Sequence, residues 1–168
     1  MASGPVLFLD IDGVLNSGEW MRAGHMRERG GKSWAGMLCP EMCARLERVL
    51  AETGASIVLS TSWRSAQPAT QIEAWLRERG ATSARIVGQT PNRRETEGGV
   101  CLGGGGGRGN EIQAWLNANP CERFAVGDDC DCGDTETVAR RFVQTSWARG
   151  IEDEHAEQLI ALLSGAKR

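Results

Sequence analysis

The amino-acid sequence predicts an α/β fold: a mostly parallel sheet with helices on both of its faces. Short apolar runs, which suit buried strands, alternate along the chain with segments whose apolar residues recur at helical spacing. Such alternation is typical of β-α-β units, in which a helix connects two parallel strands. The chain has 168 residues, so we expect residues 1–168 to form one domain.

The first half of the chain contains two strand and helix pairs. Residues 5–9 form a short apolar run that ends in a carboxylate, and residues 56–59 form a second apolar run. A helix is expected at 41–53, because its apolar residues fall on one face and Gly54 follows as a stop. The same spacing predicts another helix at 70–79.

The second half continues the alternation. Strands are expected at 85–87, 124–126 and 142–143, and helical spacing returns at 109–118. These segments therefore predict three more strands for the sheet, the last of them in the final quarter of the chain.

Two further helices are expected to begin at acidic caps. Asp134 is placed to cap a short helix through Arg140, and Asp153 to cap a last helix that reaches Leu163. Residues 97–107 are rich in glycine, and we interpret them as a surface loop within the domain.

The composition excludes several classes of protein. With 19 basic and 22 acidic side chains, the net charge is −3, which excludes a strongly basic nucleic-acid coat but not a local basic site. There is no run of 18 apolar residues, so we expect no membrane span. The N-terminus lacks the pattern of a signal peptide, so we expect a cytoplasmic protein whose six cysteines are reduced. Their spacing is not the usual spacing of zinc ligands, which makes a zinc site the weaker interpretation.

Polar residues directly follow three of the expected strands. Asp10 and Asp12 follow the first, Ser60 the second, and Asp128 and Asp129 the fourth. The carboxyl ends of parallel strands meet at one edge of a sheet, so we expect these side chains to converge. Four carboxylates would repel one another, and a cation such as Mg²⁺, which takes oxygen ligands, relieves that repulsion. The sequence therefore predicts a magnesium site formed by the four aspartates.

This set of residues suits phosphoryl transfer. Asp10 is placed to attack phosphorus and form an aspartyl-phosphate. Asp12 would protonate the leaving oxygen and then deprotonate the water that hydrolyses the intermediate. Ser60 would donate a hydrogen bond to a phosphate oxygen, and Gly13 would let the chain turn sharply after the strand.

Several segments resemble motifs of the haloacid dehalogenase (HAD) superfamily. Residues 8–15 are similar to its first motif, residues 57–60 to its second, and residues 127–129 to its fourth, acidic motif. Thr61-Ser62-Trp63-Arg64 and Arg108-Gly109-Asn110-Glu111-Ile112 further resemble the HAD domain of Swiss Army Knife RNA repair proteins. The resemblance implies a Rossmann-like HAD fold with a minimal cap, and a Mg²⁺-dependent phosphatase activity.

The resemblance also implies further site residues. The third motif of the superfamily is a lone basic residue that holds the phosphate and the nucleophile, and Arg108 fits it best. Residues 17–39 fall where the superfamily carries a flap or small cap, and their basic and aromatic residues would hold phosphate and stack a base. The residues expected to bind substrate are Gly13, Arg27, Trp34, Thr61 and Arg64.

The expected substrate is a phosphate on a polynucleotide end, such as a 3′-phosphate, because a short insert leaves the site open. Phosphorylated small metabolites or nucleotides are the first alternative. A non-catalytic HAD-like binding module is the second, although the intact Asp10 and Asp12 argue against it. A dinucleotide site is a weak third alternative, because the run of five glycines from residue 103 matches the G-x-G-x-x-G pattern trivially.

Overall fold

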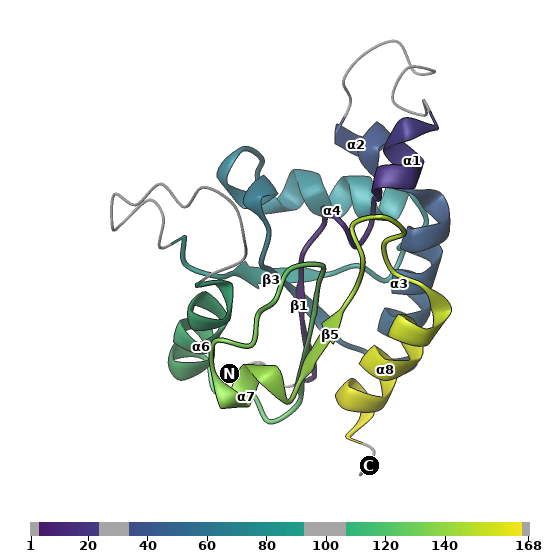
Figure 1. The fold of residues 1–168 in the computed structure, drawn as a ribbon. Helices are drawn as coiled ribbons and strands as arrows, with labels where there is room; N and C mark the ends of the chain where they lie inside the picture. Colours follow the sequence, from purple (N-terminus) through teal and green to yellow (C-terminus); the bar gives the residue numbers. More distant parts are fainter. Residues whose placement is uncertain (1–3, 24–33, 93–106, 166–168) are drawn as a thin grey trace.

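The computed structural model describes residues 4–23, 34–92 and 107–165. Its centre is a five-stranded sheet with the strand order β3-β2-β1-β4-β5, and all neighbouring strands are parallel (Figure 1). The strands are β1 (Val6–Leu9), β2 (Ser56–Leu59), β3 (Ile86–Gln89), β4 (Phe124–Asp128) and β5 (Phe142–Gln144). The predicted parallel α/β fold is confirmed.

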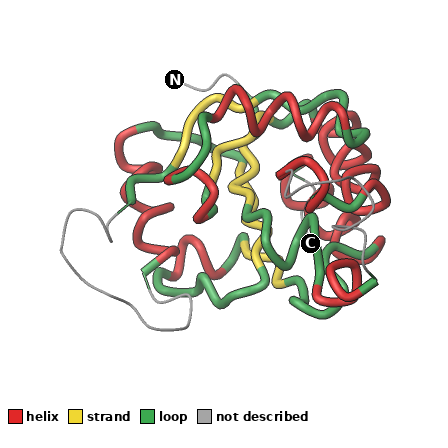
Figure 2. The backbone as a smooth tube through the Cα atoms, turned by 90° about the horizontal axis from the view of Figure 1, so that it is seen from above, coloured by secondary structure: helices red, strands yellow, loops and turns green. Residues whose placement is uncertain are grey.

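Helices cover both faces of this sheet. Seen from above, helices lie on either side of a central band of strands (Figure 2). The α-helices are α1 (Gly18–Arg22), α2 (Trp34–Met37), α3 (Pro40–Thr53), α4 (Ala69–Glu78), α6 (Arg108–Ala118), α7 (Glu136–Ala139) and α8 (Asp153–Ser164), and a 3₁₀ helix, η1, spans Ser62–Ser65. Within the described ranges, every helix is too short or too polar to cross a bilayer.

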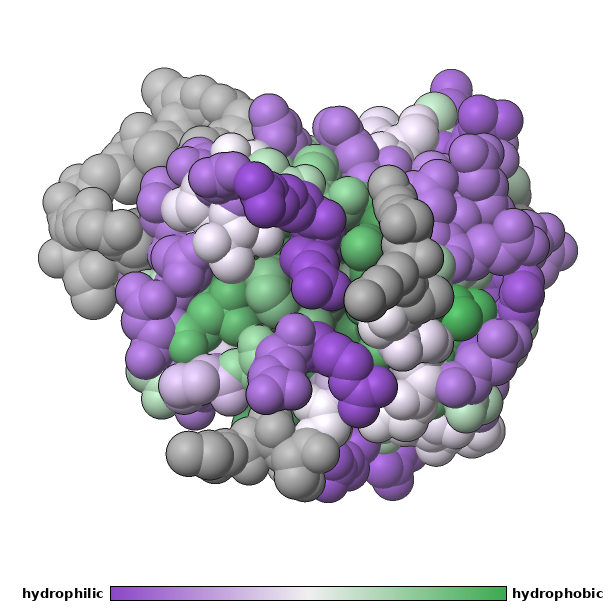
Figure 3. Space-filling view, turned by 90° about the horizontal axis from the view of Figure 1, so that it is seen from below, coloured by the Kyte–Doolittle hydropathy of each residue, from purple (hydrophilic) through white to green (hydrophobic). Residues whose placement is uncertain are grey.

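The two faces of the sheet are both apolar. Leu7 and Leu9 of β1 belong to a core shared with α3, α4 and α8, whereas Val6 and Phe8 belong to a second core shared with α6 and α7. All four side chains are completely buried. Since both of its faces are covered, the central strand β1 is apolar and buried throughout, whereas the residues of the edge strand β3 alternate between partly buried and exposed. Figure 3, viewed from below, shows hydrophobic residues in the middle with hydrophilic residues around them.

The winding of the chain fixes where a site can form. From β1 the chain builds β2 and β3 on one side of the sheet, and then returns to build β4 and β5 on the other side. The carboxyl end of β1 is therefore the point where the strand order reverses. Ligands of open α/β sheets bind at such a point.

Two predicted helix caps are wrong by one residue. Thr135, not Asp134, caps α7, and its Oγ1 accepts a hydrogen bond from the Val138 amide at 3.3 Å. Asp134 instead accepts a hydrogen bond from the Gly109 amide, which ties α6 to the segment before α7. Glu152, not Asp153, precedes α8. Asp134 and Thr135 are both residue types favoured at caps, so the pattern did not distinguish them, and Glu152 caps α8 through a reciprocal pair of hydrogen bonds with His155.

The segment predicted as a flap, residues 17–39, is described only at its two ends. These ends form α1 and α2, which lie at the top of the molecule in Figure 1. Residues 24–33 lie outside the described residues, as do residues 97–106 of the predicted glycine-rich loop. Gly107, the last residue of that loop, precedes α6 with a φ of 103°.

Candidate active site

Asp10 directly follows β1 and is 4% exposed. Its Oδ1 accepts a hydrogen bond from the Ile11 amide at 2.7 Å, and its Oδ2 lies 2.6 Å from Nη1 of Arg108. Burial and the charge of Asp128 together raise the pKa of Asp10 to about 7, against the opposing charge of Arg108. The carboxylate is thus buried, oriented and paired with a cation.

Arg108, the first residue of α6, joins the ends of three strands. Its Nη1 lies 2.7 Å from Oδ2 of Asp128 and donates to the carbonyl of Ser60 at 2.7 Å, in addition to its contact with Asp10. Burial alone would lower the pKa of Arg108, but the two carboxylates outweigh burial and raise it. The guanidinium therefore stays charged and partly neutralises both carboxylates.

The end of β4 supplies two more carboxylates. Asp128 is completely buried, and its Oδ1 accepts a hydrogen bond from the Cys130 amide at 2.9 Å. Burial and the charge of Asp128 raise the pKa of Asp129. The ligand atoms of Asp128, Asp129 and Cys130 all lie within 4.8 Å of one another.

This acidic group suits a hard cation. Burial and the neighbouring carboxylates raise the pKa of the Cys130 thiol to about 11, and a sulfur ligand suits soft metals, whereas Mg²⁺ takes oxygen ligands. The remaining ligands are carboxylate oxygens, which Mg²⁺ prefers. A fully buried carboxylate such as Asp128 also needs a positive partner, and Arg108 serves two carboxylates at once. The residues therefore fit a divalent cation.

Asp12 is held by two donors. Asn16 Nδ2 donates to its Oδ1 at 2.9 Å, and the indole Nε1 of Trp63 donates to its Oδ2 at 3.0 Å. The Asn16 side chain also accepts a hydrogen bond from the Gly13 amide at 3.0 Å, which closes the turn after β1. The sequence interpretation missed Asn16 and Trp63, although Trp63 lies within a segment that carried the family resemblance.

Gly13 occupies a position that admits no side chain. Its φ is 72°, and a Cβ here would lie 2.4 Å from Cγ of Asp129. Its carbonyl accepts a hydrogen bond from Oγ1 of Thr145, just after β5, at 2.7 Å. The glycine thus lets the loop after β1 lie directly against the ends of β4 and β5. Thr145 carried no sequence signal for this contact.

Ser60 and Thr61 follow β2 and are both completely buried. The Thr61 hydroxyl accepts a hydrogen bond from the Trp63 amide at 3.4 Å and helps to lower the pKa of Asp10, against the effect of burial. The Ser60 hydroxyl has no hydrogen-bond partner among the described residues. A buried hydroxyl without a partner is costly, and it leaves Ser60 ready to donate to a ligand atom.

A comparison with protein families gave a match that covers most of the chain. The family model described as the HAD domain in Swiss Army Knife RNA repair proteins matches residues 6–156. The chain belongs to this family. The matched range includes all five strands and every aspartate of the site, so the predicted HAD resemblance and Rossmann-like fold are confirmed. Comparisons with curated proteins and with solved structures gave no match.

A buried ion pair joins two segments of the HAD domain. Arg64 was predicted to bind substrate, but its side chain is 6% exposed and its Nη2 lies 2.7 Å from Oε2 of Glu111, which is 8% exposed. Its Nη1 donates to the Thr61 carbonyl at 2.6 Å. The guanidinium is therefore bound within the protein, where it ties the loop after β2 to the first turn of α6, beside Arg108.

The aromatic part of the predicted substrate surface is packed into the HAD domain. Trp34 contacts Trp63 edge-on at 4.8 Å and stacks on Trp75 at 6.5 Å between ring centroids. Since Trp63 donates to Asp12, Trp34 supports the site through Trp63. Arg27, the other predicted substrate contact from this segment, lies outside the described residues.

Proposed function

We propose that this HAD domain is a Mg²⁺-dependent phosphatase that acts through an aspartyl-phosphate on Asp10. One observation carries the proposal. A buried carboxylate lies at the point where the strand order reverses, paired with the cationic Arg108 and next to the fully buried Asp128. Carboxylate nucleophiles in such surroundings are suited to attack phosphorus.

The chemistry divides among the residues of this site. Asp10 Oδ attacks phosphorus, the bond from phosphorus to the leaving oxygen breaks, and Asp12 donates a proton to that oxygen. Asp12 then takes a proton from the water that attacks the aspartyl-phosphate and releases inorganic phosphate. The two hydrogen bonds that fix Asp12 support this role, because a general acid must be held within reach of the oxygen it protonates.

Two groups would hold the phosphate. Arg108 supplies a fixed positive charge at the nucleophile, and the Ser60 hydroxyl, which has no partner within the described part of the chain, can donate to a phosphate oxygen. Both lie at the end of the same β1–β2 pair as Asp10. This arrangement favours binding of a phosphate in line with the Asp10 carboxylate.

Asp10, Asp128 and Asp129 would hold the magnesium ion, together with the backbone carbonyl of Asp12. When bound, the ion supplies positive charge that favours the ionised form of Asp10 and offsets the charge of the phosphate. The raised pKa of Asp10 in the protein alone agrees with a need for this charge.

The substrate class we propose is a phosphate at the end of a nucleic-acid strand. The family to which the chain belongs is described by its occurrence in RNA repair proteins, which supports this class. Small phosphorylated metabolites and nucleotides remain the alternative class. Both classes need the same catalytic residues, so substrate preference and catalysis are separate tests.

A phosphate-release assay tests the proposal. The purified protein is incubated with 3′- and 5′-phosphorylated oligonucleotides, nucleotides and sugar phosphates, with Mg²⁺ and with EDTA. We expect release from an oligonucleotide end that EDTA abolishes and that Asp10→Asn lowers by several orders of magnitude. Asp131→Asn is the matched control, because Asp131 is an exposed carboxylate on the loop that follows β4.

Each possible outcome has a definite meaning. If Asp10→Asn keeps more than about a tenth of the wild-type rate, Asp10 is not the nucleophile. If only sugar phosphates or nucleotides release phosphate, the small-molecule alternative is correct. If no substrate releases phosphate, the domain is a binding module.

A further inference from the structure

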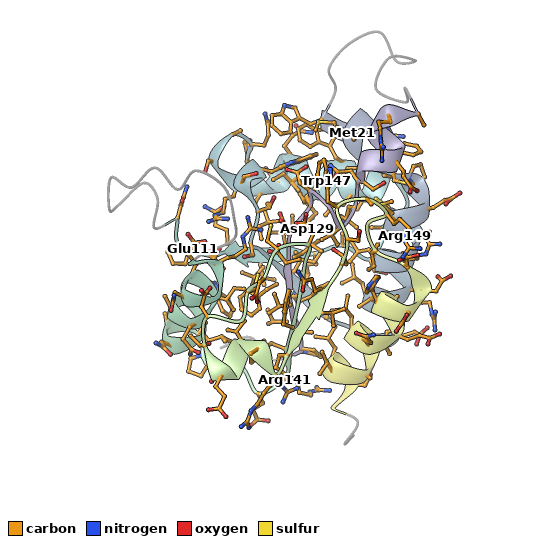
Figure 4. The ribbon with its side chains drawn as sticks, in the orientation of Figure 1. Met21, Glu111, Asp129, Arg141, Trp147 and Arg149 are labelled. Atoms are coloured by element: carbon orange, nitrogen blue, oxygen red, sulfur yellow. The ribbon has the colours of Figure 1, made fainter. Side chains whose placement is uncertain are left out.

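Trp147 is exposed at the end of the molecule that carries the candidate active site. Among the described residues, the exposed large hydrophobic side chains are Trp147, at 52%, and Val87, at 44%. Trp147 lies on the loop that follows β5, beyond the carboxyl end of that strand. Figure 4 shows it directly above Asp129, between Asp129 and Met21 of α1.

The loop that carries Trp147 is fixed by backbone hydrogen bonds. The Gly18 amide donates to the Trp147 carbonyl at 2.7 Å, and the Glu19 amide donates to the Ala148 carbonyl at 3.1 Å. Ser146 and Gly150 form an antiparallel bridge across the turn. The exposed indole is therefore presented from an ordered backbone.

The same loop is attached on both sides to the loop that carries Asp10 and Asp12. Thr145, two residues before Trp147, donates through its hydroxyl to the Gly13 carbonyl at 2.7 Å. The Ile151 amide, on the other side of Trp147, donates to the Val14 carbonyl at 2.9 Å. The position of Trp147 is thus coupled to the candidate active site by contacts with residues 13 and 14.

A cationic side chain lies beside the indole. A Cβ at Gly18 would lie 3.1 Å from Nε1 of Trp147 and 3.6 Å from Nη2 of Arg22, so both side chains approach the same glycine. Arg22 is exposed, and its Nε donates to the Gly18 carbonyl at 2.9 Å. This hydrogen bond orients the guanidinium group. A side chain at residue 18 would compete with the indole for this space.

We propose that Trp147, with Arg22 beside it, is a stacking surface for a base of the nucleic-acid strand whose terminal phosphate enters the active site. The inference rests on the proposed phosphatase function and names the part of the substrate that gives selectivity. An exposed aromatic ring next to a cation is the arrangement with which proteins bind single-stranded nucleic acid. A sugar phosphate has no base, so this surface would not improve its binding.

Charge alone does not explain binding of nucleic acid by this chain. The net charge is −3, and the exposed Arg149 near Trp147 is already paired with Glu152 at 3.3 Å. Stacking does not depend on net charge and accepts any base, because every base has a flat face. Base stacking on Trp147 is therefore the interaction with nucleic acid that the described residues support here.

Kinetics with three substrates test the proposal. The substrates are a phosphorylated single-stranded oligonucleotide, the same strand with abasic sites next to the phosphate, and glycerol phosphate. Trp147→Ala should raise the KM of the first substrate by about 5- to 150-fold and leave the other two unchanged. Trp147→Phe should retain most of the affinity, because it keeps an aromatic ring. Val87→Ala, at the other exposed hydrophobic residue, is the control and should change nothing.

Binding is measured independently of turnover. In the Asp10→Asn background, fluorescence anisotropy of the labelled oligonucleotide should show the same order of affinities, whether or not phosphate is released. Thermal unfolding of each variant confirms that it is folded, and Trp147→Gln replaces the alanine variant if that one is unstable. An equal loss with the base-bearing and abasic strands overturns the proposal. So does an oligomeric state that changes with Trp147→Ala, because the indole would then contact a protein.

Discussion

Removing either partner of the buried pair between Arg64 and Glu111 should destabilise the protein strongly. The two side chains are 6% and 8% exposed and lie 2.7 Å apart, so removing one takes a close opposite charge away from the other in a buried site. Loss of one member of a buried pair costs about 3–5 kcal/mol. We expect a decrease of this size in the free energy of unfolding for Arg64→Met and for Glu111→Leu.

The double variant separates the ion pair from general packing. Arg64→Met combined with Glu111→Leu replaces two charges by apolar side chains, which is often nearly neutral in a buried site. We therefore expect the double variant to be more stable than either single variant. Urea unfolding of all four proteins gives the coupling energy directly.

A surface pair provides the control. Arg48 and Glu52 lie 3.0 Å apart on α3 with 43% and 50% of their side chains exposed, so Glu52→Ala should cost roughly 0.5 kcal/mol or less. If the single variants of Arg64 and Glu111 also cost less than about 1 kcal/mol, the pair behaves as a surface pair, and our account of the loop after β2 is wrong.

Three other changes have definite expected outcomes. Gly13→Ala should lower the free energy of unfolding by about 1–2 kcal/mol because of the positive φ, and further because the new Cβ clashes with Asp129. Adding Asp129→Gly to this variant should remove the contribution of the clash and leave that of the positive φ, as measured by thermal unfolding. Trp63→Phe removes a donor to Asp12 and should lower kcat roughly tenfold or more at unchanged KM in steady-state kinetics. Slight burial opposes ionisation of Glu47, but three hydrogen bonds from the loop before β3 lower its pKa. The stability difference between wild type and Glu47→Gln should therefore be largest above pH 4.5 and shrink as the pH falls further, in urea titrations.

The buried parallel strands could be predicted from the sequence for a physical reason. Strands that are buried on both faces must be apolar throughout, so runs such as residues 6–9 stand out from the polar chain around them. Parallel strands bring their carboxyl ends together, so the approach of Asp10 to Asp128 followed from topology alone. The short helices α1, α2 and η1 escaped prediction because one turn shows no helical periodicity.

The contacts between side chains could not be predicted from the sequence in the same way. Arg64 and Glu111 are 47 residues apart, and each alone resembles a solvated charge. Trp34 was expected to stack on the substrate, and its packing against Trp63 was not foreseen, because both roles call for the same aromatic residue. Trp147 follows a short strand in a polar segment, and only its position in the fold distinguishes it from other tryptophans.

The most direct test of the proposed mechanism is detection of the phosphoryl group on Asp10. The enzyme is mixed with a substrate found in the phosphate-release assay, quenched in acid during turnover, digested and analysed by mass spectrometry. We expect the peptide that contains Asp10 to carry one phosphoryl group that is lost in alkali, as an acyl-phosphate is, and Asp10→Asn to carry none. Rapid phosphate release by an enzyme whose Asp10 peptide is never modified, or a phosphoryl group on another residue, would contradict the account.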